Sequence, residues 1–424
     1  MKLKLTISAI AVALGLAACG SDSAAPVVAP APVSLKFSVG VIGDLPYGLS
    51  PTDTSQFLAA PAFLKTINDD KDLSFVIHGG DIHSGKEYCT EAYDRSIYSQ
   101  LTTAITLPIV YTPGDNEWSD CHKVKQGGGS YSATTGAINY VLGTDGKPVS
   151  YASGDPIANL ALVRQIFFPT TGKTIGGAMT VHSQAVEYDT KFPTDKDYVE
   201  NVWFIKNNIM FLTLNVPGGS NNDNDIWYGT PTMTAAQTAE IANRTAANIR
   251  WLNTAFTQAT ANKVAGVVIT VQGDMWDPDT TDFVAGRAHL TQLKSMVDAV
   301  AAATKSFGNP VLLLNGDSHA YRSDNPFVSG FTCVKDLVVN TAGVGVTSGV
   351  TATTCADTTG LNVYGTDAYL NQPGGYYVPN FHRITWHGST LPMEYLKLTI
   401  DPSVNYAHGI DAFGPFKWTR MVKP

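Results

Sequence analysis

The chain has few charged residues, few cysteines and, after its first residues, no long apolar run. Only 15% of its 424 residues are charged, and the net charge is −8. A negative balance argues against a surface that binds nucleic acid. No later segment is long and apolar enough to cross a membrane. Because 44% of the residues are hydrophobic, the chain can form one large α/β domain or two smaller ones.

The first residues have the pattern of an export signal. Lys2 and Lys4 precede an apolar stretch that is too short to span a bilayer and is typical of a signal peptide. The stretch ends in Leu-Ala-Ala-Cys, which resembles a bacterial lipobox and implies cleavage before Cys19 and diacylation of its sulfur. An ordinary secretory signal with a chance cysteine is the alternative. We therefore expect an exported lipoprotein at the periplasmic or extracellular face of the cell envelope, which contacts the membrane through its lipid alone.

These patterns divide the chain into three parts. Residues 1–18 are the expected signal peptide, and residues 19–33 are rich in Pro, Ala and Ser, as in a flexible tether. Residues 34–424 remain for the folded domain.

The cysteines lack the Cys-x-x-Cys spacing that is typical of zinc sites. An oxidising compartment permits disulfides, so we expect Cys89 to pair with Cys121, and Cys333 with Cys355. Sequence alone leaves the connectivity open, since four cysteines allow three pairings.

Five runs typical of β-strands each end in a turn that carries acidic, amide or imidazole groups. The turns contain Asp44; Asp81 and His83; Asp115, Asn116 and Glu117; Gln272 and Asp274; and Asp317 and His319. A single Gly-Asp turn is ordinary turn chemistry, whereas five at strand ends indicate a shared function. Ligands bind outside the carboxyl ends of strands in such sheets, so the pattern predicts a metal-binding rim.

Helical patterns separate several of these runs. They cover about residues 55–68, 90–105, 234–260 and 283–303, and Thr234 with Gln237 forms a capping-box signature. Strands that alternate with helices predict an α/β fold with parallel or mixed sheets covered by helices. Arg244 and Arg250 are expected on the solvent-exposed face of the third helix.

In this order the motifs resemble those of the calcineurin-like metallophosphoesterases, a superfamily that includes purple acid phosphatases. The family pattern is Asp-x-His, Gly-Asp-x-x-Asp, Gly-Asn-His-Asp/Glu, a later His and Gly-His-x-His, and the resemblance covers roughly residues 36–325. It implies two mixed β-sheets packed as a sandwich with flanking helices, in four layers. It also implies an insertion at about 119–262, a strand-rich extension at about 326–424, and hydrolysis of small phosphate mono- or diesters by two divalent metal ions.

The resemblance also assigns a ligand set. The expected metal ligands are Asp44, Asp81 as the bridging carboxylate, Asp115, Gln272, Asp317 and His319. Pro46 and Ser84 stand where the family has a His and an Asp ligand. Oxygen ligands replace several imidazoles, which moves the metal preference from Zn or Fe towards Mn, Mg or Ca.

The catalytic position also departs from the family. Asn116 occupies the place of the histidine that protonates the leaving group, and an amide cannot supply that proton. His83 is a candidate replacement, although an outer-face histidine bonded to a backbone carbonyl fits the pattern equally well. His78, inside its strand, is more typical of a packed core histidine. Tyr47 and Trp118 are candidate pocket walls, although such aromatic residues more often pack in a core.

The motifs together predict a metal-dependent phosphoesterase. One alternative is a non-catalytic or single-metal binding protein on the same fold. A second is a phosphodiesterase that acts on nucleotides or lipid headgroups.

Overall fold

The computed structural model describes residues 35–176, 179–221, 225–276, 283–319, 321–328, 331–336, 351–354, 376–389 and 392–422. The expected signal peptide, Cys19 and the tether lie outside the described residues, as does Cys355. Among the described helices, none combines the length and the apolar composition that a membrane crossing needs.

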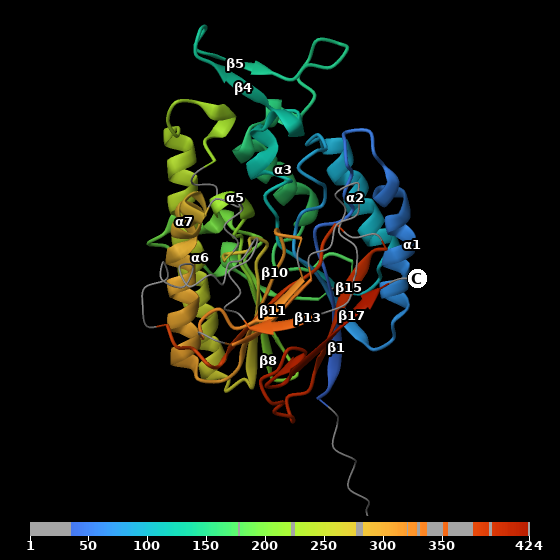
Figure 1. Ribbon diagram of the computed structural model, residues 1–424, viewed down its shortest axis with the longest axis vertical. Helices are drawn as coiled ribbons and strands as arrows, with labels where there is room; N and C mark the ends of the chain where they lie inside the picture. The colour runs from blue at the N-terminus through green and yellow to red at the C-terminus, as the bar shows by residue number, and fades with distance from the viewer. Residues whose placement is uncertain are drawn as a thin grey trace, which may run out of the picture. The chain divides into compact units, whose positions relative to one another are not determined.

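Two mixed β-sheets carry the fold (Figure 1). The six-stranded sheet has the order β16-β17-β15-β1-β2-β3, and β1, β2 and β3 are parallel. Its strands are β1 (Phe37–Ile42), β2 (Leu73–His78), β3 (Ile109–Tyr111), β15 (Glu394–Ile400), β16 (Ala412–Phe413) and β17 (Phe416–Val422). Parallel strands buried on both faces have continuous apolar runs, and every residue of β1 is indeed buried.

The second sheet has nine strands in the order β13-β12-β11-β14-β10-β9-β8-β7-β6. Its four central strands, β14, β10, β9 and β8, are parallel. The strands are β6 (His182–Ser183), β7 (Val202–Lys206), β8 (Ile209–Thr213), β9 (Gly266–Thr270), β10 (Val311–Asn315), β11 (Tyr321–Asp324), β12 (Thr332–Asp336), β13 (Thr351–Thr354) and β14 (Phe381–Thr385). A separate hairpin joins β4 (Gly129–Ser132) to β5 (Ala137–Tyr140).

Helices cover the outer face of each sheet, and Figure 1 shows α1 and α2 on one side and α6 and α7 on the other. The α-helices are α1 (Ser55–Asp69), α2 (Glu91–Ala104), α3 (Pro156–Phe167), α4 (Gln184–Glu187), α5 (Gly218–Asn221), α6 (Ala235–Ala261) and α7 (Phe283–Phe307). Short 3-10 helices are η1 (Ser119–His122), η2 (Val124–Gln126), η3 (Tyr151–Gly154), η4 (Pro193–Asp197) and η5 (Trp227–Gly229). The predicted start of α6 is confirmed, because the Thr234 hydroxyl accepts a hydrogen bond from the backbone N–H of Gln237 at 3.1 Å.

The described residues form three apolar cores. The central core contains side chains of both sheets, including Val39 of β1 and Leu312 of β10. A second core lies between the nine-stranded sheet and helices α6 and α7, and a third lies between the six-stranded sheet and helices α1, α2 and α3. The chain is therefore an α/β sandwich with mixed sheets, as the alternating pattern predicted.

The segment expected as an insertion is part of this framework. Residues 119–262 include the hairpin, but they also supply β6, β7 and β8 to the nine-stranded sheet and α6 to its outer face. Residues 326–424 supply strands to both sheets, among them β14 and β15.

The strand register brings the polar turns together. In the first sheet, Ile42 of β1 lies opposite His78 of β2, which lies opposite Tyr111 of β3. In the second, Thr270 of β9 lies opposite Leu314 of β10. Each of these strands ends within a few residues of a predicted site residue, so the polar turns meet where the two sheets face each other.

Candidate metal centre

The strand-end turns line one pocket. Asp81 and Asp115, which follow β2 and β3, share it with Asp317 and His319, which follow β10. The cavity has a volume of about 270 Å³ and is also lined by Tyr47, Gly48, Leu49, Ser84, Gly85, Lys86, Asn116, Lys125 and Ser389. Tyr47 is thus a pocket wall, as predicted, whereas Trp118 is fully buried beneath the guanidinium of Arg244.

Three of the predicted ligands are placed as a metal site requires. Asp44, Asp81 and His319 each offer one ligand atom, and these atoms lie within 4.8 Å of one another. His319 Nε2 is 3.4 Å from Asp44 Oδ1. Both carboxylates are buried, while the imidazole is partly exposed to the pocket. Two carboxylates and one imidazole are a donor set that suits first-row divalent cations.

Several of the predicted ligands have a left-handed backbone conformation. Asp44, Asp81, Asp317 and His319 have φ values of 52°, 57°, 73° and 54°. This left-handed region is unfavourable for residues with a β-carbon, and such strain tends to persist at functional sites, where the surrounding structure enforces it. Four of the six predicted ligands therefore have the backbone signature of a functional site.

Trp386, which sequence reasoning missed, holds the first ligand in place. Its indole Nε1 donates a hydrogen bond to Asp44 Oδ2, and the backbone N–H of Asp317 donates to Asp44 Oδ1 at 3.0 Å. Trp386 directly follows β14. In the sequence, Trp386 is a lone tryptophan far from the other motifs, and only the fold brings it to the site.

The same indole explains why glycine precedes the acidic residues. A β-carbon at Gly43, Gly79 or Gly316 would overlap the Trp386 ring. A β-carbon at Gly114 would overlap the carboxylate of Asp81. The recurring Gly-Asp pattern therefore reflects close packing around Trp386 and Asp81 as well as turn formation.

Asp81 is the most heavily bonded of the carboxylates. Its Oδ2 accepts bonds from the Tyr47 hydroxyl at 2.5 Å, Asn116 Nδ2 at 3.0 Å and Gln272 Nε2 at 3.1 Å. Glu117 shapes the turn beneath it, because its carboxylate accepts bonds from the backbone N–H groups of Asp81 and Gly114.

Gln272 is in the predicted position but presents the wrong atom for a ligand. Its Nε2 donates to Asp81 Oδ2 and to Asp115 Oδ1, both at 3.1 Å, and its Oε1 accepts from the Gly218 N–H at 2.5 Å. An amide coordinates a cation through its oxygen. In this structure Gln272 therefore joins two carboxylates by hydrogen bonds.

The buried carboxylates repel one another. Burial, followed by the charges of Asp115 and Asp44, raises the pKa of Asp81 well above its ordinary value. Burial and the charge of Asp120 raise the pKa of Asp115 to about 7. Burial and the charge of Asp81 likewise raise the pKa of Tyr47, so its hydroxyl stays protonated. Such a concentration of buried negative charge favours a bound cation.

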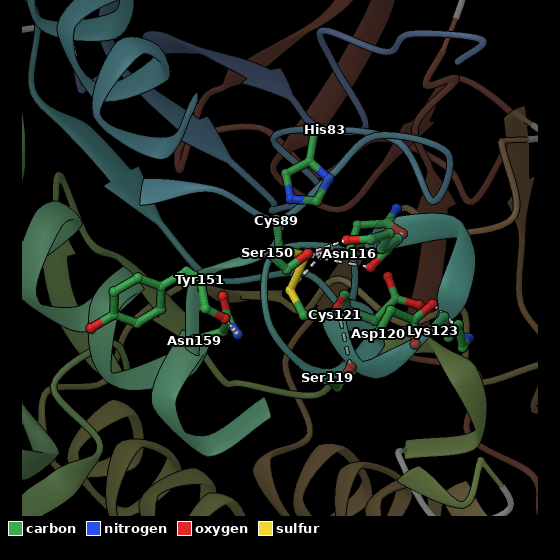
Figure 2. Close-up of a disulfide and its surroundings, with 12 residues drawn as sticks. His83, Cys89, Asn116, Ser119, Asp120, Cys121, Lys123, Ser150, Tyr151 and Asn159 are labelled. Carbon is green, nitrogen blue, oxygen red and sulfur yellow. Dashed lines mark hydrogen bonds and ion pairs between the residues drawn. A yellow bond between two sulfur atoms is a disulfide. The ribbon is translucent and has the colours of Figure 1, made fainter. Parts of the chain in front are cut away.

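Asn116 is fixed beside the predicted disulfide, which is confirmed (Figure 2). Cys89 and Cys121 are bonded, with Cα atoms 5.7 Å apart. Asn116 Oδ1 accepts from Gln126 Nε2 at 2.6 Å, and Asn116 Nδ2 points to Asp81 and to the Tyr47 hydroxyl. The second predicted pair contains Cys355, outside the described residues.

His83 does not reach the pocket. Its ring is fully buried and packs edge-on against Tyr93 of α2, and its Nδ1 lies 3.2 Å from the backbone oxygen of Ser84. Burial lowers its pKa. This placement matches the carbonyl-bonded alternative rather than a general acid. His78 is a packed core histidine, as expected, and burial lowers its pKa to about 4.

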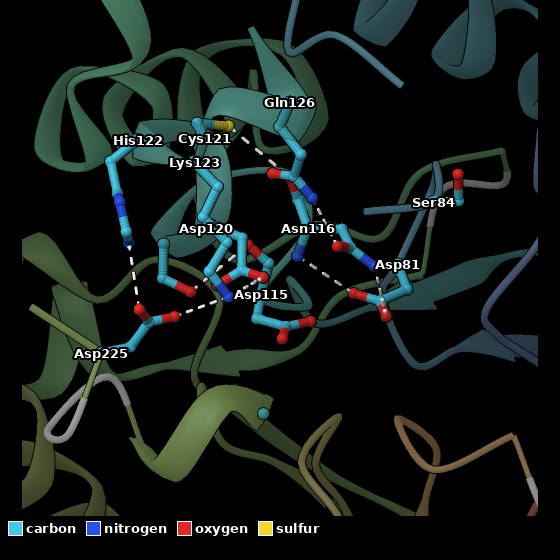
Figure 3. Close-up of polar contacts among 12 residues, drawn as sticks. Asp81, Ser84, Asp115, Asn116, Asp120, Cys121, His122, Lys123, Gln126 and Asp225 are labelled. Carbon is cyan, nitrogen blue, oxygen red and sulfur yellow. Dashed lines mark hydrogen bonds and ion pairs between the residues drawn. The ribbon is translucent and has the colours of Figure 1, made fainter. Parts of the chain in front are cut away.

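A second group of Asp and His side chains comes close enough to hold a metal ion: Asp120, His122 and Asp225 (Figure 3). Lys123 already lies between its carboxylates, with Nζ 2.6 Å from Asp120 Oδ2 and 2.5 Å from Asp225 Oδ2. His122 Nδ1 accepts from the Tyr228 N–H at 3.0 Å, so the proton of the neutral ring is on Nε2. The ammonium of Lys123 therefore serves as the cation of this group.

The expectation of a solvent-exposed position is wrong for Arg244, whereas Arg250 is partly exposed. Arg244 is fully buried and pairs with Glu240 and the side chain of Asn221. Arg250 pairs with Asp195, at 2.5 Å. Helical periodicity did not reveal that this part of α6 lies against the polar side chains of Asn221 and Asp195.

Compared with known proteins, the chain matches no protein-family model and no curated protein.

Proposed function

We propose that this protein is an exported, metal-dependent hydrolase of phosphate esters with the four-layer fold of the calcineurin-like metallophosphoesterases. The observation that carries the proposal is the cluster of Asp44, Asp81 and His319, all with left-handed backbone, of which Asp81 and His319 line the pocket. The sandwich of two mixed sheets, with polar turns after β1, β2, β3, β9 and β10, supports the family resemblance.

The donor set fits a divalent cation. Asp44, Asp81 and His319 would hold it, with Trp386 orienting Asp44. When bound, such a cation polarises a phosphoryl oxygen and activates a water nucleophile at neutral pH. Mn²⁺ and Mg²⁺ suit the oxygen-rich set best, while the imidazole also admits Fe²⁺ or Zn²⁺.

The pocket walls suit an anionic substrate. Lys86 and Lys125 line the pocket with exposed side chains, and Ser84 and the backbone of Gly85 lie beside them. The lysines would attract phosphoryl oxygens that do not reach the cation. Asn116, held by Gln126 and Asp81, would orient the ester without exchanging a proton.

The leaving group sets the substrate class. Among the described residues that line the pocket, His319 is the one imidazole, and it belongs to the proposed ligand set. Leaving groups of low pKa need no general acid. The pocket therefore suits aryl phosphates and diesters better than alkyl monoesters.

The test is metal-dependent hydrolysis by the folded domain, residues 34–424. We expect release of nitrophenol from nitrophenyl phosphate or its diester in the presence of Mn²⁺ and no release after chelation. Asp81→Asn should abolish both the bound metal and the hydrolysis. Asp298→Asn, which changes an exposed ion pair on α7, is the matched control and should retain both. Full metal content in Asp81→Asn would contradict the assignment.

A metal-binding protein without catalysis is the second candidate. The amide of Asn116 at the general-acid position favours it. It predicts metal binding that depends on Asp81 but no hydrolysis of any ester tested.

The export of the protein is proposed on the N-terminal sequence. Labelled palmitate should be incorporated by the full chain in a bacterial host and not by Cys19→Ser. If the tether holds the folded domain outside the inner membrane, protease added to spheroplasts should digest the domain.

A further inference from the structure

We infer that the pocket holds one resident cation and that the carboxamide of Gln272 takes the place of a second. The inference rests on the metal centre proposed above and departs from the two-metal arrangement that the family resemblance implies. It follows from the orientation of one buried side chain and from the hydrogen bonds of one carboxylate oxygen.

A backbone donor determines which way the Gln272 amide faces. The N–H of Gly218 donates to Gln272 Oε1 at 2.5 Å. If the amide were flipped, two donors would face each other, because a backbone N–H cannot accept a hydrogen bond. The side-chain oxygen of Gln272 therefore faces the N–H of Gly218, and the side-chain nitrogen of Gln272 points to the carboxylates.

Both hydrogens of that nitrogen are used. One is directed to Asp81 Oδ2 and the other to Asp115 Oδ1, each over 3.1 Å. These are the two carboxylates that would share a second cation in the family arrangement. In this structure the two amide hydrogens bond these carboxyl groups where that cation would lie.

Gln272 has little freedom to move aside. Its side chain is fully buried. The loop that carries Gly218 is joined to the end of β9 by a bond from Gly273 N to Val216 O at 2.8 Å. A cation coordinated by Gln272 would have to break the Gly218 bond and both carboxylate bonds together.

Asp81 Oδ2 is the second constraint. It accepts from Tyr47, Asn116 and Gln272. None of the three Gln272 bonds goes to Asp44 or His319, so a cation held by these two residues and Asp81 does not require the amide to turn. A cation bound to Asp81 and Asp115 on the other side must displace them.

The experiment measures the metal content of the folded wild-type domain after saturation with Mn²⁺ and removal of the excess. We expect about one equivalent, with the electron paramagnetic resonance spectrum of isolated Mn²⁺. About two equivalents with an exchange-coupled spectrum would overturn the inference and leave the proposed metal centre standing. No retained metal at all would overturn the metal centre, and the inference with it.

Two variants test the role of the amide. Gln272→Glu keeps the oxygen that faces Gly218 and replaces the amide nitrogen between Asp81 and Asp115 by an oxygen of a third carboxylate. We therefore expect this variant to gain a second equivalent of Mn²⁺. A single equivalent in Gln272→Glu would overturn the role given to the amide. Asp115→Asn should retain the one equivalent of the wild type, because Asp115 does not touch the resident cation. Loss of that equivalent would overturn the assignment of ligands.

Discussion

Individual residues at the pocket are arranged by bonds that reach across the whole chain. Asp44 lies at the end of the first strand, and its carboxylate is held by Trp386, more than three hundred residues later in the sequence. Asp81, Asp317 and His319 share its left-handed backbone conformation. Strain of this kind costs of order 1–3 kcal/mol per residue, so packing elsewhere in the fold has to hold these residues in place.

Trp386→Phe tests this support. Phenylalanine keeps a ring over the strand-end glycines but removes the N–H that bonds Asp44. We expect metal affinity to fall by about 10–100-fold, the usual effect of removing a group that orients a ligand. The measurement is calorimetric titration with Mn²⁺.

Trp418→Phe is the matched control. Trp418 is also buried and donates its indole N–H to the Tyr321 hydroxyl at 3.1 Å, away from the metal ligands. It should lose stability without losing metal affinity. Equal losses of affinity in both variants would show that Trp386 acts through stability alone.

A pair of histidines, of which His382 is fully buried and His408 partly buried, provides a pH dependence away from the pocket. His382 Nδ1 lies 2.9 Å from His408 Nε2, and His382 Nε2 lies 2.9 Å from Ser323 Oγ. Burial lowers the pKa of His408 to about 4. Burial, with the nearby charges of His408 and Arg383, lowers the pKa of His382 well below its ordinary value.

Replacing His408 by Gln should remove part of this pH dependence. Between the ordinary histidine pKa of about 6.5 and about 4, the unfolded chain binds a proton that the folded chain does not. Wild-type stability therefore falls through this range as the pH is lowered. We expect the stability of His408→Gln relative to the wild type to improve from pH 7 to pH 4 in chemical denaturation. Parallel curves would contradict the assignment.

At the scale of elements, buried ion pairs join the turn after β9 to β11 and β14. Asp274, after β9, accepts from Arg322 Nη1 of β11 and from Arg383 Nη1 of β14, and Arg383 also pairs with Asp324. All four side chains are fully buried. Although burial alone would raise the pKa of Asp274, the charges of Arg383 and Arg322 lower it. The network aligns the strand ends that carry Gln272, Asp317 and His319.

Asp274→Asn should therefore be strongly destabilising. Removing one partner of a buried ion pair typically costs about 3–5 kcal/mol, because the remaining charge loses its compensation. The measurement is the free energy of unfolding in guanidinium chloride. Asp298→Asn breaks an exposed pair with Lys294 on α7 and should cost less than about 1 kcal/mol. Similar small losses in both would show that the arginines are compensated elsewhere.

Across the molecule, the disulfide links the segment before α2 to η1, beneath Asn116. Cys89 and Cys121 enclose a separation of 32 residues. A cross-link of this length stabilises a fold by about 2–4 kcal/mol, chiefly by restricting the unfolded chain. We expect Cys89→Ser/Cys121→Ser to lose stability by this amount, measured by chemical denaturation. A reductant should lower the stability of the wild type by the same amount and leave the stability of the double variant unchanged. This result would assign the loss to the disulfide bond.

Sequence patterns predicted much of the fold because burial leaves a local record. Continuous apolar runs marked β1, β2, β3, β9 and β10, and period-3.6 patterns marked the helices between them. The Gly-Asp turns located the ligand-bearing ends of those strands. The boundaries of α6 followed from its cap, since Thr234 bonds the helix within one turn.

Other features depend on partners that no local pattern identifies. The face of α6 was misassigned because the polar side chain of Arg244 is buried by a loop and by Trp118. The spacing of His83 from Asp81 allowed either a place in the pocket or a bond to a backbone carbonyl, and the fold turns its ring towards Tyr93.

The sequence by itself determined the α/β class and the strand-end acids, because each depends on local propensity. It left the partner of Cys89 open among three possible pairings, and the structure joins Cys89 to Cys121. Only the tertiary structure decided that Trp386 supports Asp44 and that Gln272 presents its nitrogen to Asp81. Both outcomes depend on the direction of single hydrogen bonds between distant segments. A residue type shows which atoms are available, and only the folded chain shows which partner each atom meets.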